Sequence, residues 1–207
     1  MRVEQARSQT RRQRILDEAA QVFSRHGYRA TSVDDIAEAS GTSKGGVYFH
    51  FPSKDAIFLA LLERMAALLH DRMERAMAEA VGPTAKLDAA LLTMLRTFGA
   101  HRTLARLFLV DAIGANRELG VSIQAIQAEF IALIERQLQA AIAEGSLPPV
   151  DTEITSVAWF GALLQVVTHW LLAGRPVELN DAYPALRALL LRSVALPPAS
   201  RLKGLSA

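Results

Sequence analysis

The chain has 207 residues, of which 51% are apolar and 21% are charged, and its formal net charge at pH 7 is +2. This composition is sufficient for the core of one large or two small globular domains, so a disordered protein is excluded. The sequence has no cysteine, which excludes disulfides and thiolate metal sites. Its opening residues are charged and polar where a secretory signal would be apolar, so we expect a cytoplasmic protein.

The first predicted helix extends from about Thr10 to Arg25 and ends before Gly27. Seven arginines and only three acidic residues lie within the first thirty positions. This local basic excess suits neutralisation of nucleic-acid phosphates, although a solvated tail that aids solubility has the same composition.

Two short helices are predicted next, with a tight turn between them. Ser32 is followed three residues later by Asp35, which is the pattern of a capping box at the start of a helix over 33–39. Gly41 permits the turn, and a second helix is predicted over 44–49. This arrangement is typical of a helix-turn-helix, which presents its second helix to the DNA major groove.

The second of these helices begins with two glycines, Gly45 and Gly46, which together cost roughly 2 kcal/mol of helix propensity relative to alanine. Bare glycines let the backbone come close to a partner surface. Groups that can donate hydrogen bonds to phosphates lie nearby on Lys44, Tyr48, His50 and Lys54. The alternative is a small helical core in which the aromatic residues only pack, but packing does not explain paired glycines beside a lysine.

The run SKGGVYFHFPSKDAIF, preceded by FSRHGYRATSVDDIA, resembles the DNA-binding domain of the TetR family of bacterial transcription regulators. The resemblance covers Arg11 to Leu62, with Val47 where the family more often has leucine. It implies an all-α fold of about nine helices: a three-helix helix-turn-helix domain (10–54), a helical ligand-binding and dimerisation domain (55–196) and a flexible tail (197–207). It also implies a homodimeric, ligand-responsive regulator, most simply a repressor, that binds a pseudo-palindromic operator in double-stranded DNA.

In this interpretation the two glycines allow close approach to DNA, Thr42 and Ser43 lie near base edges, and the donors, with Thr31, hold phosphates. Half-sites are expected roughly 34 Å apart, or a multiple of that distance. The full set of predicted DNA-binding residues is Thr31, Ser32, Thr42, Ser43, Lys44, Gly45, Gly46, Tyr48, Phe49, His50 and Lys54.

Further helices are predicted over 53–80, 84–98, 102–113, 121–144, 152–173 and 181–196, separated by glycines and prolines. The segment Ile154 to Gly174 has no formal charge and is long enough to cross a bilayer. Because polar residues dilute its hydrophobicity and no second segment resembles it, we expect a buried helix in a soluble bundle and no membrane partner.

The last two predicted helices carry small and apolar residues at helical spacing, which suits close packing of two copies about a two-fold axis. The alternative is that the same residues belong to the core of the single chain. The predicted dimer interface consists of Ala158, Gly161, Ala162, Gln165, Tyr183, Leu186, Leu190 and Val194.

A small-molecule pocket is expected in the second domain, because aromatic residues and a few polar groups are typical of such sites. Each of these residues also suits an ordinary core. The predicted lining is Phe98, Phe108, Asp111, Asn116, Phe130, Trp159, Gln165 and His169. The run Arg106 to Gly120 is similar to segments of family members that sense fatty acyl thioesters, which makes acyl-CoA one possible effector beside other apolar ligands.

No catalytic constellation is found. The five histidines are scattered, and the motifs for metal, nucleotide or nucleophilic chemistry are absent from the sequence. His70 and Glu74 are expected to form a surface ion pair. We therefore predict no enzyme activity, no metal and no cofactor; the alternative is a small-molecule binding or catalytic helical protein whose DNA-binding domain is vestigial.

Overall fold

The computed structural model describes residues 2–111 and 117–195, and over this range the chain is all-α without a strand, as predicted. A π-helical turn (Leu107–Asp111) follows α6, and a 3-10 turn (Leu179–Ala182) precedes α9. The α-helices are α1 (Arg2–Ala30), α2 (Val33–Ala39), α3 (Lys44–His50), α4 (Lys54–Ala78), α5 (Pro83–Ala100), α6 (Arg102–Arg106), α7 (Arg117–Ala143), α8 (Thr152–Ala173) and α9 (Tyr183–Ala195). The predicted tail, 197–207, lies outside the described residues.

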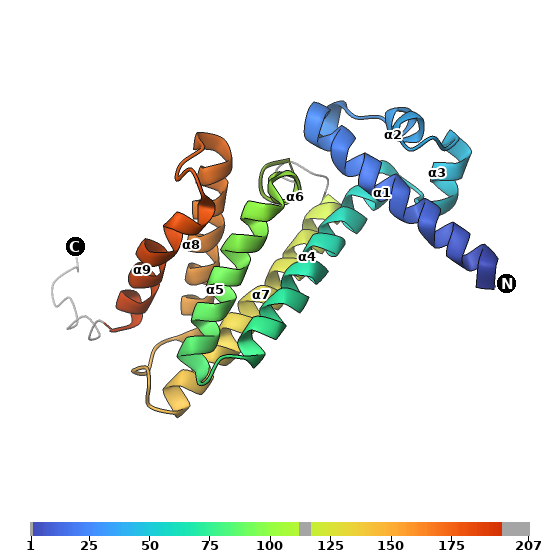
Figure 1. Ribbon diagram of the computed structural model, residues 1–207. Helices are drawn as coiled ribbons and strands as arrows, with labels where there is room; N and C mark the ends of the chain where they lie inside the picture. Colours follow the sequence, from blue (N-terminus) through green and yellow to red (C-terminus); the bar gives the residue numbers. More distant parts are fainter. Residues whose placement is uncertain (1, 112–116, 196–207) are drawn as a thin grey trace, which may run out of the picture.

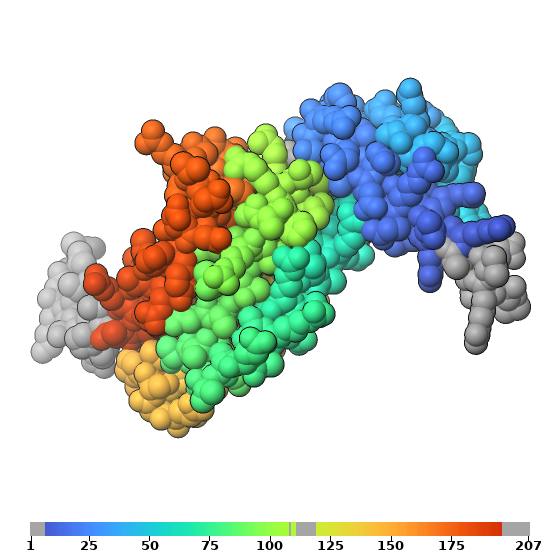
Figure 2. All heavy atoms as spheres, in the orientation of Figure 1, coloured from blue at the N-terminus to red at the C-terminus, as the bar shows by residue number. Residues whose placement is uncertain are grey.

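Helices α1 to α3 gather at one end of the molecule, and α4 extends from them into a bundle with α5, α7, α8 and α9 (Figure 1). In the space-filling view the α1–α3 group projects from one end of this bundle (Figure 2). Buried side chains nevertheless form one continuous apolar cluster from Ile15 on α1 to Val194 on α9. The position of α3 therefore depends on packing that continues through α4 into the bundle.

Helix α1 begins at Arg2, well before the predicted Thr10. The early residues lack an apolar stripe, so periodicity misses them, although Arg, Glu, Gln and Ala are good helix formers. Gly27 has non-helical backbone angles (φ 79°, ψ 157°) and divides a final short turn from the main helix. The predicted break at Gly27 is therefore present, but the chain returns to a helix beyond it.

The predicted capping box at the start of α2 is confirmed. The Asp35 amide donates to Ser32 Oγ (3.1 Å), and the Ser32 amide donates to Asp35 Oδ2 (2.7 Å). Ser43 caps α3 in the same way by accepting from the Gly46 amide (3.1 Å). Each cap satisfies an amide that has no partner inside its helix, which fixes the start of each short helix.

Several predicted helices have different limits. Helix α7 begins at Arg117 rather than at 121. The helix expected over 102–113 is α-helical only to Arg106 and then continues as the π-helical turn, while 112–116 lie outside the described residues. The last helix begins at Tyr183 rather than at 181. Pro184 is tolerated there because the first turn of a helix does not use its amide hydrogens.

Within the described residues, α8 is the one helix long and apolar enough to span a membrane, but only 39% of its most apolar window is buried. The expectation of a buried helix is thus correct for one side of α8 only. Its other side exposes apolar and small residues to solvent. The predicted ion pair between His70 and Glu74 is present on α4 at 2.9 Å.

Candidate nucleic-acid interface and effector pocket

Helix α3 has one buried and one exposed side. Val47 is fully buried, whereas Tyr48 is 45% and Phe49 is 79% exposed. Arg12 of α1 stacks over the ring of Phe51, the residue after α3, with its guanidinium 4.8 Å from the ring centroid. The inner side of α3 is therefore anchored, while two aromatic rings are exposed on its other side. Helix α3 lies at the end of the molecule away from α8 and α9 (Figure 1).

The two glycines of α3 have different surroundings. A Cβ added at Gly45 would meet no atom within 4 Å, whereas a Cβ at Gly46 would lie 2.7 Å from Thr42 Cγ2 and 3.2 Å from Ser43 Oγ. The turn between α2 and α3 therefore requires a glycine at 46 for its own packing. This corrects the interpretation that both glycines serve DNA, because only the space at Gly45 is open to a partner.

The other residues at the start of α3 are held in place by local bonds. Lys44 Nζ donates to Asp34 Oδ2 at 2.7 Å, and this bond raises the pKa of the Lys44 ammonium. Both side chains are more than half exposed, so Lys44 remains accessible to other anions. Thr42 is half-buried and its hydroxyl donates to the Ser40 carbonyl at 3.4 Å, whereas Ser32 and Ser43 are exposed caps.

Thr31 and Lys54 occupy positions different from those predicted. Thr31 is buried, and its hydroxyl donates to the Gly27 carbonyl (2.8 Å). Lys54 Nζ donates to the carbonyls of Tyr28 (2.9 Å), Thr31 (2.8 Å) and Arg29 (3.3 Å). The prediction that these two side chains contact phosphates is corrected. The Thr31 hydroxyl bonds within the end of α1, and Lys54 joins that end to the start of α4, because carbonyls at a helix end attract a cation.

A second contact reinforces this junction. The Tyr28 hydroxyl donates to Asp55, the second residue of α4, and the Tyr28 ring lies 4.5 Å from that of Phe58 between centroids. Burial of the hydroxyl, and then its hydrogen bond to Asp55, raises the pKa of Tyr28 well above its usual value. We call the group Tyr28, Lys54 and Asp55 the α1–α4 clamp.

His50 ends α3 beside the basic residues of α1. Its ring is half-buried and meets the ring of Phe49 edge-on, with 5.1 Å between centroids. Burial, followed by the nearby charges of Arg11 and Arg12, lowers the pKa of His50. The imidazole is therefore predominantly neutral at pH 7, and one of its nitrogens is then an acceptor.

The predicted pocket residues do not come together. Phe98 is buried in the core, Phe130 stacks on Phe160 with 6.2 Å between centroids, and Gln165 and His169 lie on the exposed side of α8. The side chains of Phe108 and Asp111, and the whole of Asn116, lie outside the described part of the chain. Trp159 alone among the remaining predicted residues lines a cavity in the bundle. The aromatic signal therefore indicated core packing more than a pocket.

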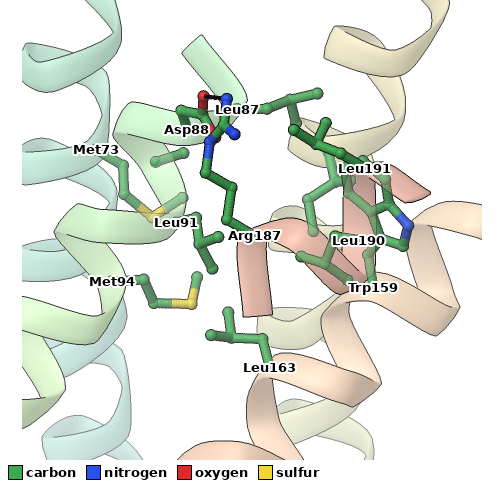
Figure 3. Close-up of a pocket in the computed structure, with 12 residues that line it drawn as sticks. Met73, Leu87, Asp88, Leu91, Met94, Trp159, Leu163, Arg187, Leu190 and Leu191 are labelled. Carbon is green, nitrogen blue, oxygen red and sulfur yellow. Dashed lines mark hydrogen bonds and ion pairs between the residues drawn. The ribbon is translucent and has the colours of Figure 1, made fainter. Parts of the chain in front are cut away.

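That cavity lies among α4, α5, α7, α8 and α9 and has a volume of about 40 Å³ (Figure 3). Nearly all of its lining is aliphatic or thioether, which sequence reasoning missed because leucine and methionine on helices do not distinguish a cavity from a core. The exceptions are the indole of Trp159 and an ion pair in which Arg187 Nε and Nη2 donate to the two carboxylate oxygens of Asp88, each at 2.7 Å. The other lining residues are Met73, Leu87, Ala90, Leu91, Met94, Ile134, Trp159, Leu163, Leu190 and Leu191.

The predicted dimer residues divide between two environments. Ala158, Gly161 and Gln165 are exposed on α8, with Ala162 half-buried beside them. They continue an exposed apolar stripe that includes Ile154, Val157 and Leu172. On α9, by contrast, Leu186, Leu190 and Val194 are buried within the same chain and Tyr183 is half-buried, whereas Leu189 is 60% exposed. The α9 part of the predicted interface is therefore corrected: the face of α9 that is open to solvent carries Leu189, not Leu186, Leu190 and Val194.

A family model described as "Bacterial regulatory proteins, tetR family" matches residues 15–61, which include α2, α3 and the α1–α4 clamp. A second, described as "YsiA-like protein, C-terminal region", matches residues 61–193. The chain belongs to the TetR family. As a TetR-family member it is a ligand-responsive, DNA-binding transcription regulator, and α3 is the second helix of its helix-turn-helix domain.

Characterised relatives and solved structures agree with this TetR-family assignment. The transcriptional repressor KstR2 of Rhodococcus jostii is 27% identical over 195 residues, which cover 90% of this chain and 92% of KstR2. The fatty acid degradation regulator FadR of Bacillus halodurans is 26% identical with a TM-score of 0.82, over 87% of this chain and 94% of that one. FadR of Bacillus subtilis, solved with stearoyl-CoA, is 23% identical with a TM-score of 0.80, over 86% and 97%, and this likeness shows the fold.

Within the described residues no group of three or more histidine, aspartate or glutamate side chains is placed to hold a metal ion. The relatives are transcriptional regulators. The site itself offers an exposed helix end that carries a cation and two aromatic rings, and an apolar cavity with one ion pair.

Proposed function

We propose that the protein is a cytoplasmic repressor without enzyme activity, which binds a pseudo-palindromic operator as a homodimer and is released by a small apolar or amphipathic effector. The observation that carries this proposal is the outward side of α3, where Tyr48 and Phe49 are exposed beside the open backbone of Gly45. Exposed aromatic rings are costly in water unless a partner covers them. A major groove offers both thymine methyl groups and phosphates to such a surface.

The DNA contacts follow from these positions. Gly45 brings the helix backbone close to the groove, Phe49 contacts base edges through apolar contact, and Lys44, Tyr48 and His50 hold phosphates. Ser32, Thr42 and Ser43 lie close to the duplex at the starts of α2 and α3 and contribute hydroxyls and capped amides. Two copies of α3 reach successive major grooves when the half-sites lie roughly 34 Å apart.

The exposed stripe of α8, together with the face of α9 that carries Leu189, supplies the proposed dimer interface. Gly161 and Ala158 leave room for close approach of a second helix, while Ile154, Val157 and Leu172 contribute apolar area. The corresponding patch on a second chain is self-complementary about a two-fold axis, so four helices pack together. This arrangement covers the apolar surface that α8 exposes in the single chain.

The division into a DNA-binding domain (10–54) and an effector domain (55–196) places the boundary at the α1–α4 clamp. Met73 on α4 lines the cavity, and Lys54 at the other end of the same helix holds the carbonyls of α1. An occupant that enlarges the cavity displaces α4 and thereby reorients α3. Release requires that effector and DNA prefer different positions of α4.

An effector with an acyl chain is supported by the aliphatic lining of the cavity and by the likeness to a fatty acid degradation regulator. Acyl-CoA is one such molecule, and other apolar molecules satisfy the same lining. The methionines at 73 and 94 can change rotamer, so the cavity can take occupants of different shape.

The test is a gel-shift titration of the full-length protein, purified without detergent, against the DNA upstream of its own gene. We expect a shift at nanomolar protein that a shuffled duplex of the same length does not give at the same salt concentration. The matched variant Phe49→Ala keeps the anchored side of α3 and is expected to lose the preference for the upstream DNA. If the wild-type protein gives no shift, a small-molecule binding protein with a vestigial first domain replaces the repressor.

A further inference from the structure

The cavity in the bundle has a single charged feature, and this feature crosses it. Arg187 extends from α9 along the cavity to Asp88 on α5 (Figure 3). The one other polar atom among the lining side chains, Trp159 Nε1, already donates to Ser193 Oγ at 3.1 Å. A bound molecule therefore meets aliphatic, thioether and indole groups everywhere except at Arg187 and Asp88.

The cavity is small relative to common ligand sites. Its volume of about 40 Å³ leaves room for roughly three water molecules, whereas sites for drug-sized ligands measure about 300–1,000 Å³. An occupant must therefore move side chains aside. Met73 and Met94 are unbranched and adapt at low cost, and Leu91 and Leu191 lie at the half-buried edge of the cavity. A slender, flexible chain enters such a site more easily than a rigid ring system.

We propose that this cavity binds an alkyl chain with an anionic head group, and that the head group pairs with Arg187 in place of Asp88. This inference rests on the proposed effector response and specifies the chemistry of the effector. The guanidinium is planar, always charged and matched to a carboxylate through two parallel hydrogen bonds. Asp88 already shows this geometry, so the fork is preorganised for a second carboxylate.

The exchange is feasible because neither partner is deeply buried. The side chain of Arg187 is 40% exposed and that of Asp88 is 24% exposed, so the released Asp88 carboxylate regains hydration. A neutral head group offers Arg187 no charge to replace Asp88. A cationic head group has to displace the whole arginine fork to reach Asp88, which leaves the guanidinium without its partner.

Displacement of Asp88 also has a consequence for the fold. The ion pair connects α5 with α9, and α9 carries Leu189 on the proposed dimer face. An anion on Arg187 therefore removes the ion pair between α9 and α5 while the alkyl chain presses on Met73 of α4. The effector acts on the dimer helix and on the helix that positions α3 at the same time.

The experiment compares four ligands with the same ten-carbon chain: decanoate, decanol, decyltrimethylammonium and decanoyl-CoA. Full-length Trp170→Phe protein is used, so that Trp159 fluorescence reports on the cavity. We expect decanoate to bind at least roughly tenfold more tightly than decanol, a preference of about 1.4 kcal/mol. If decanoyl-CoA binds more tightly than decanoate, the effector is an acyl-CoA thioester. If decanoate binds more tightly, the effector is a free fatty acid.

Variants in the same background assign the preference to the ion pair. Arg187→Met is expected to abolish the preference for decanoate over decanol, while Asp88→Asn retains it and tightens decanoate binding. Arg187→Lys keeps the positive charge but lacks the paired donors of the guanidinium, so we expect an intermediate preference for decanoate over decanol. This variant provides the comparison if Arg187→Met does not fold. Arg96→Met, an exposed arginine on α5, is the matched control and leaves the preference unchanged.

Several outcomes overturn the inference: equal affinities for decanoate and decanol, a preference that survives Arg187→Met, or no binding of any decyl compound. A gel shift of the wild-type protein separates these outcomes from failure of the repressor assignment. A shift without a head-group preference removes only the inference. A head-group preference without a shift removes the repressor and leaves the binding site in place.

Discussion

The ammonium group of Lys54 lies 4.6 Å from the ring centroid of Tyr28 and donates to the Tyr28 backbone carbonyl at 2.9 Å. One residue at the start of α4 thus holds both the side chain and the backbone of a residue at the end of α1. The two helices cannot separate at this point without breaking charged hydrogen bonds, so motion of α4 carries the DNA-binding helices with it.

Replacement of Lys54 by methionine is expected to lower the free energy of unfolding by about 1–3 kcal/mol, because it removes hydrogen bonds from a charged donor. Urea denaturation followed by circular dichroism measures this change. The same variant should bind operator more weakly and respond less to effector. Tyr28→Phe, which keeps the ring but removes the bond to Asp55, should have a smaller effect. Equal stability of Lys54→Met and wild type would show that the α1–α4 clamp does not stabilise the fold.

The clamp also predicts a pH dependence. The pKa of Tyr28 is raised in the folded state by burial and by the bond to Asp55, whereas in the unfolded chain it is about 10. The contribution to stability is therefore complete below pH 10 and is lost as the pH rises above that value. We expect the free energy of unfolding to fall more steeply above pH 10 in the wild type than in Tyr28→Phe. Parallel curves for the two proteins would contradict this assignment.

The two glycines of α3 give a matched pair of variants. Gly45→Ala meets no atom, so it should leave stability unchanged or raise it by up to about 1 kcal/mol, and it should weaken operator binding roughly tenfold by holding the backbone away from the groove. Gly46→Ala collides with the stiff side chain of Thr42 and should destabilise the fold by about 1–3 kcal/mol. Thermal melts and gel shifts on both variants measure this, and undiminished DNA binding by Gly45→Ala would remove its proposed role.

In the proposed complex, Asp34 competes with DNA phosphates for the Lys44 ammonium group. Lys44→Ala should weaken binding to operator and random DNA alike and reduce the salt slope by roughly 0.9 for each phosphate that the protein no longer neutralises. Asp34→Asn should have the opposite effect on affinity, because it frees the ammonium from its 2.7 Å partner. Fluorescence anisotropy at several salt concentrations gives both quantities. An unchanged slope in Lys44→Ala would rule out a phosphate contact at this position.

The outward faces of α8 and α9 are tested by added charge. Gly161→Glu and Leu189→Glu should each convert the dimer into monomers, because a carboxylate would be buried between like copies. Val81→Glu, at a 93% exposed position between α4 and α5, is the control and should remain dimeric. Leu190→Glu should unfold the chain instead, since Leu190 lines the cavity. Sedimentation of both interface variants as dimers would exclude this interface.

The sequence was a good guide wherever structure is determined by neighbours along the chain. Ser32 and Asp35 are three residues apart, so their reciprocal bonds follow from the pattern itself. The break at Gly27 and the short helix α3 followed in the same way. The predicted role of Lys54 was wrong, because its carbonyl partners lie more than twenty residues earlier and only the packing of α1 on α4 brings them within reach.

The cavity and the outward face of α9 depend on packing that no spacing in the sequence records. Helix α9 is apolar on both sides, so periodicity could not separate buried Leu190 from exposed Leu189. Phe98 and Phe130 appeared suitable for a pocket but fill the core, while the cavity is formed by leucines and methionines. Asp88 and Arg187 are 99 residues apart, and nothing in the sequence around either residue indicates that the two form an ion pair.

Helix α4 contains neither glycine nor proline between Lys54 and Met73, which are separated by roughly 28 Å of continuous helix. This part of α4 therefore has no residue at which the helix is expected to bend, so a displacement at one end is carried to the other. Substitutions around the cavity can therefore change which molecule binds there while the coupling to the operator is preserved, because α4 transmits the displacement as one continuous helix. New specificities can arise at one end of α4 without any redesign of the other.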